Sequence, residues 1–135
     1  MGQLIRSAAP KSRDRGAAAV EFALILPIVL LVIFAIIDFG RMLNAQITLT
    51  EAARESARAA ALVDEAAGQA RFDQAAKSTV GDLNPTVVAC LPDGSRENAV
   101  VDVTYTFQYV TPLGLLIGAG GTVNLKGHGV MPCLH

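Results

Sequence analysis

Residues 16–37 read GAAAVEFALILPIVLLVIFAII, and this stretch decides the fold of the chain. Between Ala17 and Ile37 it contains one charged residue, Glu21, and one proline, Pro27. At about 1.5 Å per residue, a helix over this stretch is roughly 31 Å long, close to the ~30 Å hydrocarbon core of a bilayer. The sequence therefore predicts a membrane-spanning helix from Ala17 to Ile37.

Three other structures for this stretch agree less well with the sequence. A cleavable secretory signal has an apolar region of about 7–15 residues followed by a small-x-small cleavage site. Here the run is longer, and the residues that follow it, Asp38 to Arg41, mark the exit of the helix to water. A core helix would need more apolar mass around it than the rest of the chain offers. An interfacial helix would have a polar face, which this run lacks.

Residues 1–15 form a polar, basic segment that we expect to be disordered. The basic residues are Arg6, Lys11, Arg13 and Arg15. Positive charge beside a span favours the cytoplasmic side, so the residues after Asp38 should lie outside the cytoplasmic membrane, in the periplasm. The formal net charge of −1 gives no basic footprint for binding nucleic acid.

Glu21 is the unusual residue of the span, because a carboxylate costs ~2.5–3.5 kcal/mol at the centre of a bilayer and less near its edge. One interpretation is that Glu21 only reaches up to the lipid headgroups. The other starts from the order of residues: basic residues, then Gly16, four small apolar residues, then Glu21 and Phe22. This order matches the processing site of type IV prepilins, where a peptidase cleaves after the glycine. Cleavage would make Ala17 the first residue, and its ammonium group would share a helix face with Glu21.

A longer set of residues resembles the TadE-like family, which are minor pilin-like proteins of tight-adherence (Tad, Flp-type) pilus systems. The resemblance is carried by RGAAAVEFALILP at 15–27, IIDFGR at 36–41 and AARESAR at 52–58, and it covers about residues 16–61. Two positions depart from the usual pattern: Asp38 stands where such sequences often have Glu, and Phe22 where the major pilins often have Tyr.

The resemblance implies a minor pseudopilin that prepilin peptidase cleaves between Gly16 and Ala17, and that enters a Tad pilus or primes its assembly. Its expected partners are the membrane, the peptidase, other pilin and pseudopilin subunits and the assembly platform. Glu21, followed by Phe22, would pair with the N-terminal amine of its own or a neighbouring subunit. The alternative is an uncleaved accessory protein, anchored in the inner membrane, that binds pilus or secretion machinery.

We expect an α+β fold in three parts: a leader (1–16), a continuous transmembrane and stalk helix (17–63), and a small exported domain (64–135) with a pilin-like antiparallel sheet. Pro27 removes one backbone donor and should kink or loosen the helix. Beyond the span, small residues recur at helical spacing. They pack either against the chain's own tail or against neighbouring helices: Leu49, Ala52, Ala53, Ala57, Ala60 and Ala61.

In the exported part, a short second helix is predicted over residues 70–80, after an interruption at Asp64, Glu65 and Gly68 and before Gly81. Strands are predicted over 86–90, 98–110 and 122–130. Residues 98–110 alternate most clearly, with Val101, Val103, Tyr105, Phe107 and Tyr109 on one face. The apolar, glycine-rich connection 111–121 either covers the small core or contacts the membrane or another subunit.

Cys90 and Cys133 both lie in the exported part, where an oxidising compartment favours one disulfide between them. A metal site formed by these cysteines with His128 and His135 is the weaker interpretation, because no close ligand pair such as Cys-x2-Cys is present. No serine lies near a histidine in the sequence. We therefore expect no enzyme, no cofactor, no metal and no small-molecule substrate.

Overall fold

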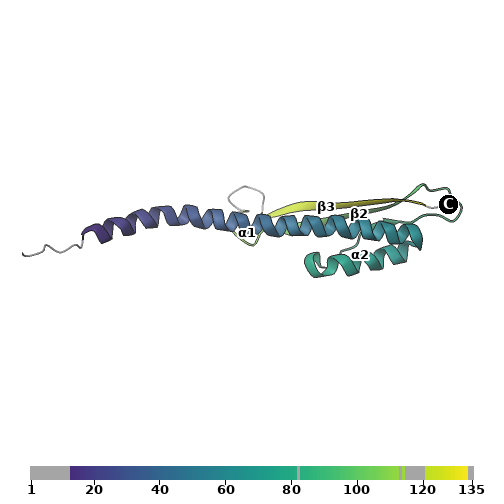
Figure 1. Ribbon diagram of the computed structural model, residues 1–135, viewed down its shortest axis with the longest axis horizontal. Coiled ribbons are helices and arrows are strands. Elements are labelled where there is room, and N and C mark those ends of the chain that lie inside the picture. Colours follow the sequence, from purple (N-terminus) through teal and green to yellow (C-terminus); the bar gives the residue numbers. More distant parts are fainter. Residues whose placement is uncertain (1–12, 82, 113, 115–120, 134–135) are drawn as a thin grey trace, which may run out of the picture.

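The computed structural model of the chain describes residues 13–81, 83–112, 114 and 121–133. In this part of the chain, two helices are followed by three strands (Figure 1). The elements are α1 (Arg13–Leu62), α2 (Glu65–Val80), β1 (Thr86–Val88), β2 (Asn98–Gln108) and β3 (Thr122–Pro132).

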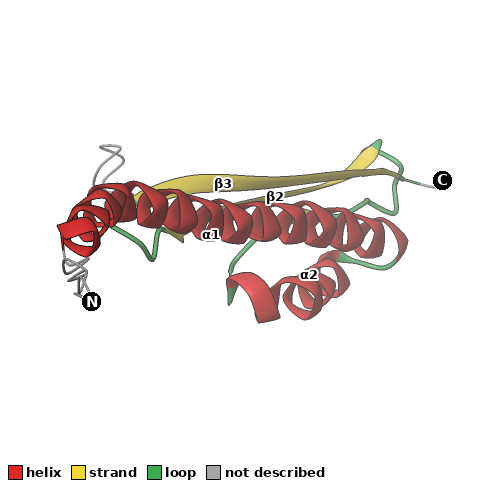
Figure 2. Ribbon diagram, turned by 60° about the vertical axis from the view of Figure 1, so that its left-hand side comes forward, coloured by secondary structure: helices red, strands yellow, loops and turns green. Residues whose placement is uncertain are grey.

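The molecule is elongated along α1, which runs through Pro27 without a break (Figure 1). The N-terminal half of α1 projects alone. We call its apolar residues 17–37 the anchor segment. The C-terminal half lies between the sheet on one side and α2 on the other (Figure 2). This half, from Asp38 onward, forms the head together with α2 and the sheet. The predicted α+β fold is confirmed, and the predicted stalk is the central helix of the head.

The three strands form one antiparallel sheet in the order β1-β2-β3. β2 lies in the middle, so that Val101 is opposite Val87 on one side and Gly129 on the other. Alternate residues of β2 are buried and exposed, as the sequence pattern predicted. Three ends differ from the prediction: β1 ends at Val88 rather than at residue 90, β2 ends at Gln108 rather than at residue 110, and β3 continues to Pro132.

The second helix begins earlier than the sequence pattern indicated. Asp64, predicted to interrupt a helix, is the N-cap of α2, and its side chain accepts a hydrogen bond of 2.7 Å from the backbone N–H of Ala67. Gly68 lies inside the helix and is buried. A Cβ at Gly68 would lie 2.9 Å from the Cβ of Ala60, so the glycine allows α2 to lie close to α1. Gly81, with a φ of 76°, ends the helix as predicted.

The stripe of small residues on α1 packs against the chain's own head. Leu49, Ala52, Ala53, Ala57 and Ala60 are all buried, whereas Ala61 is partly buried. Toward the anchor segment the core joins α1, α2 and the sheet, and consists of Ala45, Leu49, Ala52, Phe72, Ala76, Val80, Val103, Phe107 and Leu125. Of the two predicted roles for the stripe, internal packing is therefore the one that the structure shows.

Two glycines of β3 allow the backbone of α1 to lie directly against the strand. A Cβ at Gly127 would be 2.7 Å from the carbonyl oxygen of Leu49, and one at Gly129 would be 2.2 Å from that of Ala53. Two residues of a strand advance about 6.6 Å and four residues of a helix about 6 Å, so the two pairs stay in step. Any larger residue at these positions would push the helix off the sheet.

The structure joins Cys90 and Cys133 in a disulfide, with 5.7 Å between their Cα atoms. The bond lies at the end of the sheet farthest from the anchor segment. There the backbone N–H of Cys133 also donates to the carbonyl of Glu97 over 2.8 Å. The bond thus links the chain after β1 to the chain after β3, across the width of the sheet.

We predict that Gly129→Ala destabilises the head by about 1–3 kcal/mol or more, because the added methyl meets backbone atoms that cannot rotate away. Gly40→Ala is the matched control: Gly40 lies in α1, and an added Cβ meets no atom within 4 Å. It should stabilise the helix by up to about 1 kcal/mol. Thermal unfolding of the full chain in detergent micelles, followed by circular dichroism, measures both. Equal stabilities for the two variants would contradict the packing described here.

We also predict that peptide mapping without reductant recovers Cys90 and Cys133 in one cross-linked pair. Reduction should lower the unfolding free energy by about 4 kcal/mol, because the closed loop is long and the chain-entropy model gives that magnitude. Two free thiols in freshly isolated protein would refute the pairing.

Candidate membrane anchor and its junction with the head

The anchor segment presents its apolar side chains on all sides. The residues from Val20 to Ile37 are mostly exposed, and none of the most apolar part of the helix is buried against the rest of the protein. A core helix of a soluble protein would be mostly buried, so the exposed surface argues against that alternative. α1 is the one helix within the described residues that is long and apolar enough to cross a membrane. It is consistent with a single-pass membrane anchor.

The predicted processing site lies at the start of this exposed surface. Gly16, Ala17, Glu21 and Phe22 are all exposed, and a Cβ at Gly16 would meet no atom within 4 Å. α1 begins at Arg13, so the bond between Gly16 and Ala17 lies within its first turns. Among the residues that the structure describes, Glu21 has no hydrogen-bond or ion-pair partner. The assigned roles of these four residues, and the kink at Pro27, stay predictions.

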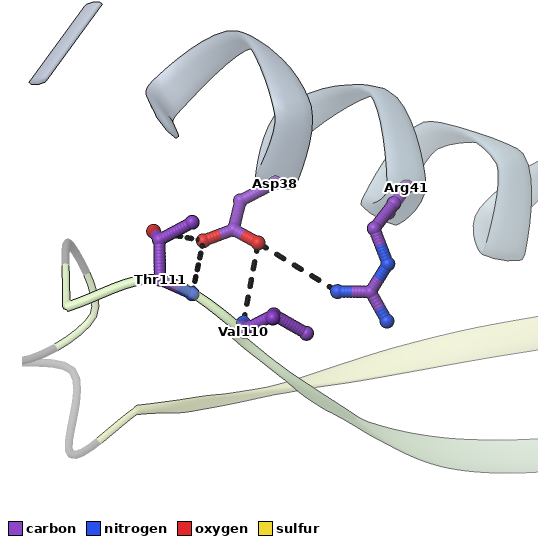
Figure 3. A network of polar contacts seen from close by, with 4 residues as sticks. All are labelled: Asp38, Arg41, Val110 and Thr111. Atoms are coloured by element: carbon purple, nitrogen blue, oxygen red, sulfur yellow. Dashed lines mark hydrogen bonds and ion pairs between the residues drawn. The ribbon is translucent and has the colours of Figure 1, made fainter. Parts of the chain in front are cut away.

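Asp38, the first residue after the anchor segment, is buried, with 1% of its surface exposed. Its carboxylate accepts hydrogen bonds of 3.2 Å from the backbone N–H groups of both Val110 and Thr111, and another from the Thr111 hydroxyl (Figure 3). The guanidinium of Arg41, one turn further along α1, lies 3.6 Å from the carboxylate. Asp38 therefore connects the start of the head's central helix to the chain just after β2.

Arg41 belongs to the same junction through its contact with an aromatic ring. Its guanidinium lies 5.3 Å from the centre of the buried Phe107 ring, and Tyr109 packs edge-on against Phe107. These contacts hold the cation against the end of β2. Sequence reasoning treated Asp38 and Arg41 as residues at an exit to water. The structure shows a polar cluster in which Asp38 is buried and Arg41 is half-exposed.

The other predicted sites are distributed over the head. His128 contacts Asp102 over 2.7 Å on the exposed face of the sheet, and the two cysteines of the predicted metal site are bonded to each other. Residues 13–81, 83–112, 114 and 121–133 contain no group of three or more His, Cys, Asp or Glu side chains placed to hold a metal ion. His135 and most of the connection 111–121 lie outside the described residues, so neither prediction about that connection is tested.

Comparison with known proteins supports the sequence resemblance. Residues 16–58 match the family model described as TadE-like protein. The matched region covers the predicted processing site, the anchor segment, the Asp38–Arg41 turn and most of the small-residue stripe. No curated protein and no solved structure matches the chain. Residues 16–58 of the chain are therefore a TadE-like region.

Proposed function

We propose that the protein is a minor pseudopilin-like structural subunit of a Tad/Flp-type pilus, cleaved by prepilin peptidase after Gly16. The match of residues 16–58 to the TadE-like family supports a role in Tad pilus assembly, and a structural rather than an enzymatic one. The observation that carries the finer proposal is the order along α1. An exposed Gly16 is followed by Glu21, by an exposed apolar segment, and then at once by the folded head.

Glu21 supports a role in assembly, because insertion alone gives no reason for a carboxylate in this segment. Replacing it with an apolar residue would make the segment easier to insert. Glu21 has no hydrogen-bond or ion-pair partner among the described residues of its own chain, so we expect its partner to be a cation that cleavage or assembly brings to it. After cleavage, the ammonium of Ala17 in the same or an adjacent subunit is such a cation. In low dielectric this pair would specify register more than it would add net stability.

Contact with other subunits is supported by the surface of α1 just beyond the anchor segment. Phe39, Leu43 and Ile47 are 57%, 43% and 55% exposed and follow one another at intervals of four residues, so they lie on one helix face. The small core residues Ala45 and Leu49 lie on another face, toward the head. An exposed apolar face that continues out of the bilayer suits packing against a second helix that does the same.

The alternative is an uncleaved accessory protein that binds the pilus or secretion machinery from the inner membrane. One observation favours this alternative. α1 begins at Arg13 and continues through Gly16 and Ala17, so the bond that the peptidase would cleave lies inside a helix. Under both proposals, the N-terminus lies in the cytoplasm and the head outside the membrane, because the basic residues precede the span.

We predict that mass spectrometry of the protein from membranes that contain the peptidase finds Ala17 as the first residue. Gly16→Arg should leave the full-length chain, because the residue before the cleaved bond no longer fits. Gly2→Arg adds the same charge within the leader and should be processed normally. Wild-type protein that keeps residues 1–16 in such cells would exclude the pseudopilin and leave the accessory protein.

We further predict that Glu21→Ala inserts into the membrane at a normal level but reduces the number of pili per cell to near that of cells lacking the protein. Glu21→Gln should be nearly as defective, because the amide keeps the shape and loses the charge. Glu51→Gln, which changes an exposed carboxylate of α1 in the head, serves as the control and should assemble normally. Normal piliation with both Glu21 variants would show that this carboxylate only reaches the headgroups.

A further inference from the structure

Between the anchor segment and the core of the head there is a stretch of α1 with little apolar packing. Among the described residues from 16 to 44, Asp38 alone is buried, and the apolar core begins at Ala45. Met42 is partly buried against that core. At the end of the head nearest the bilayer, the polar contacts of Asp38 therefore extend the attachment of α1 beyond the apolar cluster around Phe107.

The surroundings of Asp38 favour strong hydrogen bonds. A groove of about 460 Å³ lies on its bilayer side, lined mainly by the apolar side chains of Leu31, Val32, Ile36 and Phe39. In such apolar surroundings a charge-assisted hydrogen bond is stronger than in water, and a buried carboxylate without donors is unfavourable. The two backbone N–H groups of Val110 and Thr111 lie beyond the end of β2, so Asp38 takes the place of a neighbouring strand for them.

We propose that Asp38 is a positioning residue that holds the bilayer end of the head on α1, so that the head and the anchor segment move as one rigid body. The carboxylate joins two parts of the chain that are 72 and 73 residues apart. Without it, the chain at Val110 and Thr111, just after β2, would be free to separate from α1 while the rest of the head stays packed. The packing from Ala45 to Ala60 and the disulfide hold the opposite end independently.

This inference goes beyond the proposed function and does not depend on it, because it concerns how force and orientation pass from anchor to head in a single chain. The contacts of Asp38 supply a link between α1 and the chain after β2 in a part of α1 where no apolar side chain is fully buried.

The first test is hydrogen exchange of the full chain in lipid nanodiscs, comparing Asp38→Asn with the wild-type protein. The amide of Asn keeps one acceptor oxygen but presents an NH2 group in place of the other and carries no charge, so one of the two backbone N–H groups loses its acceptor and the other is left with a weaker, uncharged one. Exchange of the Val110 and Thr111 amides should rise about tenfold or more, which corresponds to the loss of one charged hydrogen bond. Exchange in α2 and at Val101 should not change. Ser56→Ala is the matched control, because it removes a buried hydrogen bond of 2.7 Å from α1 to Gly68 far from the junction.

The second test measures the position of the head directly. Nitroxide labels at Leu30 in the anchor segment and at Thr122 at the start of β3, both exposed, report their separation by pulsed electron paramagnetic resonance. The distance distribution should be narrow in the wild-type and Ser56→Ala proteins and broad in Asp38→Asn. Thr111→Val removes the hydroxyl donor and keeps the buried carboxylate, so it should broaden the distance distribution less. This variant replaces Asp38→Asn in the test if Asp38→Asn does not fold.

Two results would overturn the proposal. One is an unchanged distance distribution and unchanged exchange at Val110 and Thr111 in the Asp38 variant, or in Thr111→Val if the former does not fold. The other is an equal rise in exchange throughout the head, which would make Asp38 a general stabilising residue. Neither measurement requires pili. Both therefore test the role of Asp38 even if the protein is not a pilus subunit.

Discussion

The head depends on the close approach of α1 to the strand β3 and the helix α2. Gly127 and Gly129 bring the backbone of β3 against the carbonyl groups of Leu49 and Ala53, and Gly68 does the same for α2 beside Ala60. Side chains of ordinary size at these positions would separate the layers. Because few aromatic residues are available, the head obtains its buried surface by short distances between layers of small residues rather than by large side chains.

A single helix serves two environments, and the change occurs over a few residues. Before Asp38 most apolar side chains of α1 are exposed, as suits contact with lipid, whereas from Ala45 onward one face of the helix is buried in the head. A helix can make this change without a break because its backbone hydrogen bonds are internal in both settings. Only the side chains differ between the two settings, and at the junction the buried side chain is the carboxylate of Asp38.

The two ends of the head are held by different means. At the bilayer end, hydrogen bonds from Val110 and Thr111 to Asp38 close the structure, whereas at the opposite end the bond between Cys90 and Cys133 does so. Between them lies a core to which Phe72 and Phe107 add the largest buried side chains. A small domain with a narrow core gains most from such links at its ends.

The sequence by itself determined the anchor segment, the helix that continues from it and the resemblance of residues 16–58 to the TadE-like family. Each of these depends on residues close together in the chain: an apolar run, helical periodicity, and the local order Gly16, Glu21, Phe22. The alternation in β2 was equally readable, because a half-buried strand repeats every two residues. The two cysteines could be paired because there was only one possible partner for each.

Only the tertiary structure decided what the small residues and Asp38 do. The stripe around Ala53 could face any helix or sheet, and its partner, Gly129, is identified only by the packing. Gly68 looked like a helix break because glycine lowers the stability of a helix, and this effect can be read from the sequence. The close contact with Ala60 that favours glycine there depends on the packing of α2 on α1. Asp38 looked like an exit to water because its donors, at residues 110 and 111, follow the end of β2 and are brought to it by the sheet.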